Sequence, residues 1–115
     1  MNEQQANKLR GLMGLCVRAR QAVFGEDGCM KTIRAGNCGA LLLDSGASNA
    51  TRDKYRGVCE NAGTLLVELP EGLLHEATGK PGVAMAILKG GFANQVTQMI
   101  NATNTVKHSG GASVE

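Results

Sequence analysis

The sequence predicts an α/β protein in which helices cover both faces of a central sheet. Segments with the three-and-four spacing of amphipathic helices alternate with short apolar runs, which is typical of layered α/β folds. The runs at 40–43 and 83–88 are apolar throughout, as expected of strands covered on both faces. Aromatic residues make up only 3% of the chain and tryptophan is absent, so we expect a core of Leu, Ile, Val, Ala and Met.

The first part of the chain predicts two helices and two strands. Apolar residues recur at steps of three and four over 4–20, which indicates an amphipathic helix. A short strand is predicted over 21–24, and Gly25 then leads into a second helix that ends at Gly36. The apolar run at 40–43 is the next strand.

The middle of the chain predicts a third helix, a third strand and a short fourth helix. Ser48 or Asn49 is a suitable N-cap for the third helix, and Gly63 ends it. The segment 64–69 is the next strand, and a short helix follows up to Thr78.

The chain ends with a strand, a helix and a polar segment. The strand is predicted over 83–88, and a final helix of about three turns extends to Ile100. From Asn101 onward the residues are polar and show no periodicity. We therefore expect a single domain over 1–102 and a flexible tail over 103–115.

The charge balance excludes a strongly basic nucleic-acid-binding arm. Twelve Lys and Arg residues stand against ten Asp and Glu residues, which gives a formal net charge of +2. If RNA binds, it is therefore expected to bind a local patch. The first five residues are polar and no apolar run approaches the length of a membrane span, so we expect a cytoplasmic protein without a signal peptide.

The cysteines and histidines do not form a recognisable metal-binding pattern. The four cysteines are separated by wide, unequal gaps without a Cys-x-x-Cys pair, and His75 and His108 lie far from them in the sequence. We expect free, mostly buried thiols in a reducing cytosol and no metal site.

Catalytic and cofactor motifs are also missing from the sequence. Ser45 lies in an Asp-Ser-Gly turn without the spacing of a nucleophile elbow. No phosphate-binding Walker loop occurs, and Gly90-Gly91 is too short to be a dinucleotide fingerprint. The sequence therefore predicts a protein that is not an enzyme, with no catalytic residues and no cofactor.

The most informative segment is Val23–Gly36, which turns through glycine into a helix N-terminus. Such a terminus exposes free backbone N–H groups, and the basic residues Lys31 and Arg34 follow on the helix, so the segment can hold phosphate. The acids Glu26 and Asp27 favour the helix macrodipole, and this capping role is as plausible as a binding role. Lys31 and Arg34, taken alone, are by default residues of a solvated helix face.

The chain carries the pattern Gly-x-x-x-x-x-Lys-x-Ile-x-x-Gly from Gly25 to Gly36, and a buried strand and an Asp/Ala/Ser loop follow it. This arrangement resembles the kink-turn-binding ribosomal protein superfamily of the archaeal ribosomal protein seven-Ae type. The segments 14–19, 47–51, 79–82 and 91–93 are similar to its bacterial YlxQ-like branch. The resemblance spans Lys8 to Ile100 in one unbroken order.

The resemblance implies a three-layer α/β/α sandwich around a four-stranded mixed sheet, and binding of a kinked helix-bulge-helix RNA. It implies that Gly25 allows close approach of the RNA, that Glu26 and Asp27 occupy the next turn positions, and that Lys31 contacts a phosphate. The loop before the last strand would hold an unstacked nucleotide by apolar and backbone contact. The residues of this loop are Thr78, Gly79, Lys80, Pro81, Gly82 and Val83.

The chain departs from the family pattern at three positions. Many members carry Asn or Lys at the position of Asp27 and Glu or Gln at that of Gly28, where side chains read base edges, and the bacterial branch commonly has Arg at the position of Val83. Our leading hypothesis is nonetheless a monomeric, non-enzymatic, ribosomal-type protein that binds structured RNA, with ribosomal RNA as one candidate partner.

Two alternatives remain open. A protein-interaction adaptor on the same fold would fit the near-neutral charge, the acids Glu26 and Asp27 and the missing side chain at Gly28. A small metal or thiol-redox enzyme would rest only on the four cysteines.

Overall fold

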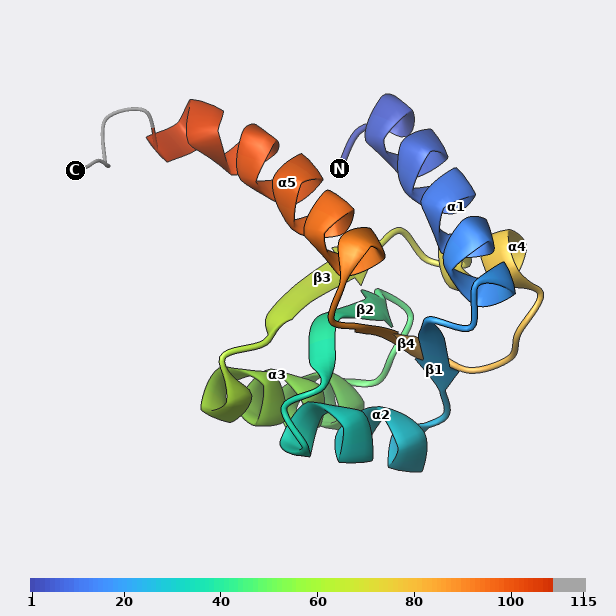
Figure 1. Ribbon diagram of the computed structural model, residues 1–115, viewed down its shortest axis with the longest axis vertical. Helices are drawn as coiled ribbons and strands as arrows, with labels where there is room; N and C mark the ends of the chain where they lie inside the picture. Colours follow the sequence, from blue (N-terminus) through green and yellow to red (C-terminus); the bar gives the residue numbers. More distant parts are fainter. Residues whose placement is uncertain (109–115) are drawn as a thin grey trace.

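The computed structural model describes the backbone of residues 1–108 and the side chains of residues 1–101 (Figure 1). Over this part of the chain it contains the five helices and four strands that the sequence predicts. The helices are α1 (Glu3–Arg18), α2 (Glu26–Arg34), α3 (Asn49–Ala62), α4 (Leu73–Thr78) and α5 (Gly91–His108). The strands are β1 (Ala22–Phe24), β2 (Cys38–Asp44), β3 (Leu65–Leu69) and β4 (Ala84–Leu88).

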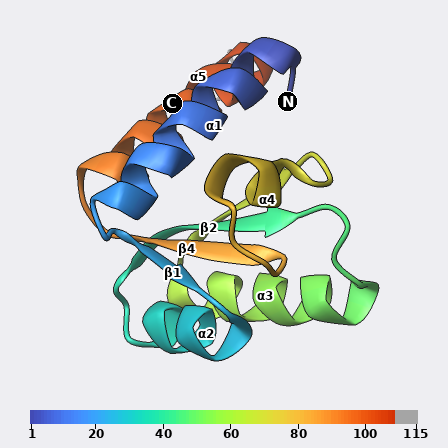
Figure 2. The same ribbon diagram turned by 90° about the vertical axis from the view of Figure 1, so that its right-hand side faces the viewer.

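The strands form one mixed sheet with the order β1-β4-β2-β3. β2 and β3 run parallel, whereas β4 runs antiparallel to both of its neighbours, β1 and β2. Figure 2 shows α1, α4 and α5 on one face of the sheet and α2 and α3 on the other. The predicted α/β class, with a three-layer α/β/α sandwich around a four-stranded mixed sheet, is therefore confirmed.

Two apolar cores lie on opposite faces of the sheet. Leu42 and Ile87 belong to the core under α1, α4 and α5, whereas Leu41 packs on the other face with Ile33 of α2 and Tyr55 of α3. Neighbouring residues of β2 enter different cores because successive side chains of a strand point to opposite faces. All five side chains are buried, so the central strands are covered on both faces as predicted.

Local capping sets where α1 and α3 begin and end. α1 begins with a reciprocal capping box, in which the Asn2 side chain accepts from the Gln5 backbone and the Gln5 side chain accepts from the Asn2 backbone. Ser48 Oγ accepts a hydrogen bond of 3.2 Å from the backbone N–H of Thr51 at the start of α3. Gly63 ends α3 in the left-handed conformation, so both predicted signals are confirmed.

The final helix is longer than the sequence predicts. α5 continues to His108, so the prediction of a helix that ends at Ile100 is wrong. Ala93 and Val96 anchor the first turns of α5 in the core, and an anchored helix propagates at little cost through residues of modest helix propensity. The rest of the predicted tail, 109–115, lies outside the described residues, and the single domain over 1–102 stays a prediction.

None of the helices in the described part of the chain combines the length and the apolar character that a membrane crossing requires.

Replacing Leu42 by Ala should lower the free energy of unfolding by about 2–5 kcal/mol, because the side chain is inaccessible to solvent and its removal leaves a cavity. Urea denaturation followed by circular dichroism measures this change. Leu15→Ala is the matched control, since the Leu15 side chain is 49% exposed and its truncation should change stability by no more than about 0.5 kcal/mol. Equal losses in the two variants would contradict the assigned core.

Candidate nucleic-acid interface

The sheet register brings the two predicted binding segments to the same end of the sheet. Phe24, the last residue of β1, pairs with Met85 near the start of the antiparallel strand β4. Gly25, directly after β1, therefore lies at the same end of the sheet as Val83, directly before β4. The end of β2 lies there too, because the backbone N–H of Asp44 donates to the carbonyl of Val83 at 2.7 Å. The start of α2 and the α4–β4 loop (residues 79–83) are therefore neighbours in space.

Gly25 makes the sharp entry into α2. Its φ of 86° and ψ of 147° are accessible to glycine but strained for other residues. No side chain caps the helix, and the first helical hydrogen bond runs from the Cys29 N–H to the Gly25 carbonyl at 2.9 Å. The backbone N–H groups of the first turn therefore have no partner within α2, and such groups are suited to hydrogen-bond an anion. Glu26 and Asp27 lie in this first turn, both exposed.

Gly28 is a packing residue. A Cβ atom at this position would lie 2.9 Å from Cγ1 of Val23 on β1, closer than real Cβ contacts allow. A glycine inside a helix costs up to about 1 kcal/mol relative to alanine. Here it allows α2 to lie closely against β1.

The positive charge of this face comes from three residues on two helices. Lys31 and Arg34 of α2 are exposed and have no ion-pair or hydrogen-bond partner among the side chains that the structure describes. Lys54 of α3 forms an ion pair with Glu26 at 2.6 Å between Nζ and Oε2. The cleft between the two helices has a volume of ≈ 430 Å³, and its lining consists of Glu26, Asp27, Met30, Lys31, Arg34 and Lys54.

Arg34 lies at the end of α2 opposite Gly25. It is the last residue of α2, about 12 Å along the helix axis from Glu26 at a rise of 1.5 Å per residue. The register brings Gly25, Glu26, Asp27 and the α4–β4 loop to one end of the sheet, whereas Arg34 lies at the opposite end of α2.

The α4–β4 loop is held by its own backbone and by Thr78. The Thr78 hydroxyl donates to the Leu74 carbonyl at 2.7 Å and accepts from the Lys80 N–H at 3.1 Å. His75 Nδ1 lies 3.2 Å from the Lys80 carbonyl. Gly79 and Gly82 have positive φ angles, Lys80 and Pro81 are exposed, and Val83 packs partly against the core under α2 and α3. The loop thus presents backbone and small apolar surface in a fixed form.

Asp44 is a structural residue of this end of the sheet that the sequence analysis missed. Its carboxylate is buried and accepts from the Gly46 N–H at 2.7 Å and from the Gly72 N–H at 2.9 Å, so one side chain fixes two loops. The signal is an acid directly after a buried strand. Lys54 was missed as well, and no local pattern distinguishes it from other exposed helix lysines.

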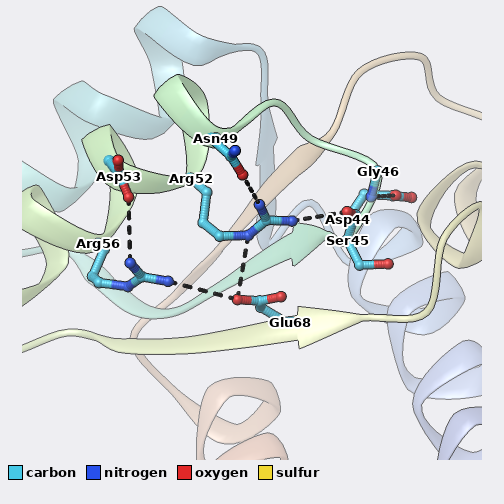
Figure 3. A network of polar contacts seen from close by, with 8 residues as sticks. All are labelled: Asp44, Ser45, Gly46, Asn49, Arg52, Asp53, Arg56 and Glu68. Atoms are coloured by element: carbon cyan, nitrogen blue, oxygen red, sulfur yellow. Dashed lines mark hydrogen bonds and ion pairs between the residues drawn. The ribbon is translucent and has the colours of Figure 1, made fainter.

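A second network fixes the start of α3 (Figure 3). Arg52 donates to the Ser45 carbonyl at 2.8 Å and lies 3.5 Å from Glu68 of β3. Arg56 reaches the same carboxylate at 4.0 Å and Asp53 at 3.3 Å. These two arginines already have protein partners, so they add little free positive charge to the surface.

The cysteines are all buried and free, as the sequence predicts. Burial raises the pKa of Cys16, Cys38 and Cys59 to about 11 and also raises the pKa of Cys29. Burial likewise raises the pKa of Tyr55, next to Cys29. A thiol with a raised pKa is a poor nucleophile and a poor metal ligand at neutral pH, so these residues fit a packing role.

Asp44→Ala should lower the free energy of unfolding by about 1–3 kcal/mol, because it leaves the Gly46 and Gly72 N–H groups without their acceptor. Urea denaturation provides the measurement. Asp53→Ala removes an exposed carboxylate with a single ion pair and should change stability by no more than about 0.5 kcal/mol. If Asp44→Ala unfolds at the same urea concentration as the native protein, this carboxylate does not hold the loops.

Stability should fall as the pH rises above 9. Unfolded thiols ionise from pH 9, whereas Cys16, Cys38 and Cys59 stay protonated in the folded protein up to a pKa of about 11. The folded state therefore holds more protons in this range, and the free energy of unfolding decreases with pH. Thermal melts between pH 9 and 11 measure how steeply stability falls with pH, and this slope should be shallower in the Cys16→Ala variant. A stability that is flat or rises between pH 9 and 11 would contradict the raised pKa values.

The chain matches no protein-family model, but individual proteins match most of its length. It is 32% identical to the RNA-binding protein YlxQ of Bacillus subtilis (strain 168) over 92 residues, which cover 78% of this chain and 92% of that protein. It is 28% identical to the RNA-binding protein YlxQ of Enterococcus faecium over 101 residues, which cover 87% and 98% of the two chains.

A solved structure agrees with the fold. The 15.5kD RNA binding protein of Giardia lamblia superimposes with a TM-score of 0.73 over 91% of this chain and 92% of that one, at 17% sequence identity, so this likeness concerns the fold alone. The relative from Bacillus subtilis exceeds 30% identity along nearly its whole length. The predicted bacterial branch is therefore confirmed, and the chain belongs to the YlxQ family.

Proposed function

We propose that this protein binds structured RNA and does not catalyse a reaction on it. The observation that carries the proposal is the register of β1 on β4, which aligns an uncapped helix N-terminus with the exposed α4–β4 loop. The names of its relatives, RNA-binding proteins, support the same function.

The α2 side of the interface would hold the RNA backbone. Gly25 lets a phosphate approach the free N–H groups of the first turn, and Lys31, one turn further along, supplies the charge. Glu26 and Asp27 do not preclude this role. Lys54 offsets the charge of Glu26, and Asp27 lies at the positive end of the helix dipole.

The α4–β4 loop would hold an unpaired nucleotide. Thr78, Gly79 and Gly82 fix its path, while Lys80 and Pro81 are exposed for contact and Val83 supports the loop from below. Single-stranded bases are recognised by stacking and by backbone hydrogen bonds, which such a loop supplies. An RNA that places a helix next to a bulge, as a kink-turn does, fits both halves of the interface, and ribosomal RNA is a candidate source.

We further propose that the protein acts as a monomer in the cytoplasm. Its four unpaired thiols support a reducing compartment.

A protein-interaction adaptor is the second candidate. A cleft of ≈ 560 Å³ between α1 and α5, with the exposed side chain of Leu15 on its wall, favours this function. Co-purification separates the two: strong nucleic-acid absorbance supports the first candidate, and a stoichiometric protein partner without RNA supports the second.

Lys31→Gln should weaken binding to a kink-turn hairpin and reduce the slope of log K against log salt by about one, because one phosphate contact is lost. Calorimetric titrations at several salt concentrations provide both values. Lys89→Gln is the matched control, since Lys89 is an exposed lysine at the opposite end of β4. A hairpin without the bulge tests specificity. Identical binding by Lys31→Gln and the native protein would rule out the assigned site.

A further inference from the structure

We propose that the groove between α2 and α3 carries a second stretch of the RNA backbone, and that Lys54 is the phosphate contact within it. The inference rests on the proposed RNA-binding function and extends it away from the sheet end. It starts from the position of Arg34, at the end of α2 opposite Gly25 and the α4–β4 loop.

Two hollows follow α2 from one end to the other and meet at Arg34. The cleft that Glu26, Lys31 and Lys54 line also reaches Arg34, and a second hollow of ≈ 270 Å³ continues from Arg34 past Val58 and Asn61. Figure 2 shows the two helices together on one face of the sheet, away from α1 and α5. α2 has nine residues, so the groove extends about 14 Å along it. We call these two hollows together the α2/α3 groove.

The chemistry of the α2/α3 groove favours a phosphodiester backbone. The lining carries three positive charges, from Lys31, Arg34 and Lys54, and two negative charges, from Glu26 and Asp27. The amide of Asn61 adds a neutral hydrogen-bonding group at the far end. Met30 forms part of the floor but is almost fully buried, and the apolar side chains at the far end are those of Val58 and Ala62. The groove also begins at the helix N-terminus where the proposed interface lies, so one RNA could occupy both.

The ion pair between Lys54 and Glu26 sets the state of the groove in the free protein. Both side chains are about half exposed, and ion pairs exposed to this extent contribute little to stability. Lys54 can therefore leave Glu26 for a phosphate with little loss. The pair keeps Lys54 next to the groove, and the carboxylate competes with RNA for the same ammonium group.

Three hairpins and a double-mutant cycle test this inference. The hairpins share one bulge: in one both stems are short, and in the others one or the other stem is extended by a helical turn. Glu26→Gln should bind one of the extended hairpins more tightly than the native protein does. Glu26→Gln/Lys54→Gln should bind that hairpin about 2- to 10-fold more weakly than Glu26→Gln alone, with a salt slope lower by about 0.7–1.

On the short hairpin, removing Lys54 from the Glu26→Gln background should have a smaller effect than on the extended hairpin, whereas Lys31→Gln weakens binding to all three hairpins. Lys89→Gln controls for a general loss of charge, and thermal melts verify that the variants fold. The groove inference alone fails if Lys31→Gln weakens binding but Lys54→Gln leaves the affinity for every hairpin unchanged. It fails likewise if Lys54→Gln lowers the affinity for every hairpin by the same factor. It also fails if poly-glutamate displaces the extended hairpin as effectively as unlabelled RNA. If the native protein binds none of the hairpins, the proposed function fails with it.

Discussion

The pairing of β2 with β4 is the constraint on which the rest of the structure depends. Leu41, Leu42, Met85 and Ile87 on these strands are all inaccessible to solvent, so both faces of the sheet must be covered by helices. Because β4 is antiparallel to β2 and also pairs with β1, the start of β4 meets the ends of both strands. The loops at that end come together as a consequence of strand order, and the Asp44 carboxylate then bonds two of them.

The distribution of charge explains how a protein with a net charge of only +2 can present a basic surface. Several arginines are engaged by carboxylates of the same chain: Arg10 bonds Glu76 between α1 and α4, and Arg52 bonds Glu68 between α3 and β3. These pairs join elements that are distant in the sequence. Lys31 and Arg34, which have no such partner among the described side chains, lie on one helix. Net charge is therefore a poor guide to this surface, and the local arrangement of charge is a better one.

Much of the fold could be predicted from sequence because its signals are local. The apolar runs gave the strands, and Ser48 and Gly63 gave the limits of α3. The end of α5 could not be predicted, since Asn and Thr have modest helix propensity and packing of the preceding turns outweighs it. At the candidate site, Gly25 and Lys31 follow from local pattern. Glu26 contacts Lys54, and Asp44 contacts Gly72. In each pair the residues are 28 positions apart in the sequence, so these contacts depend on how the layers pack and have no local signal.

The contact between Gly28 and Val23 links two positions that local sequence patterns treat as independent. A glutamine or glutamate at 28, as many proteins of the resembling superfamily carry, needs space that the Val23 side chain occupies. A larger residue at position 28 therefore requires that the side chain at position 23 shift or become smaller, or that α2 move away from β1. The two positions should vary together among related sequences, with a small residue at one accompanying a larger residue at the other. Base readout by α2 is thus limited by the volume of a strand residue that does not face the RNA.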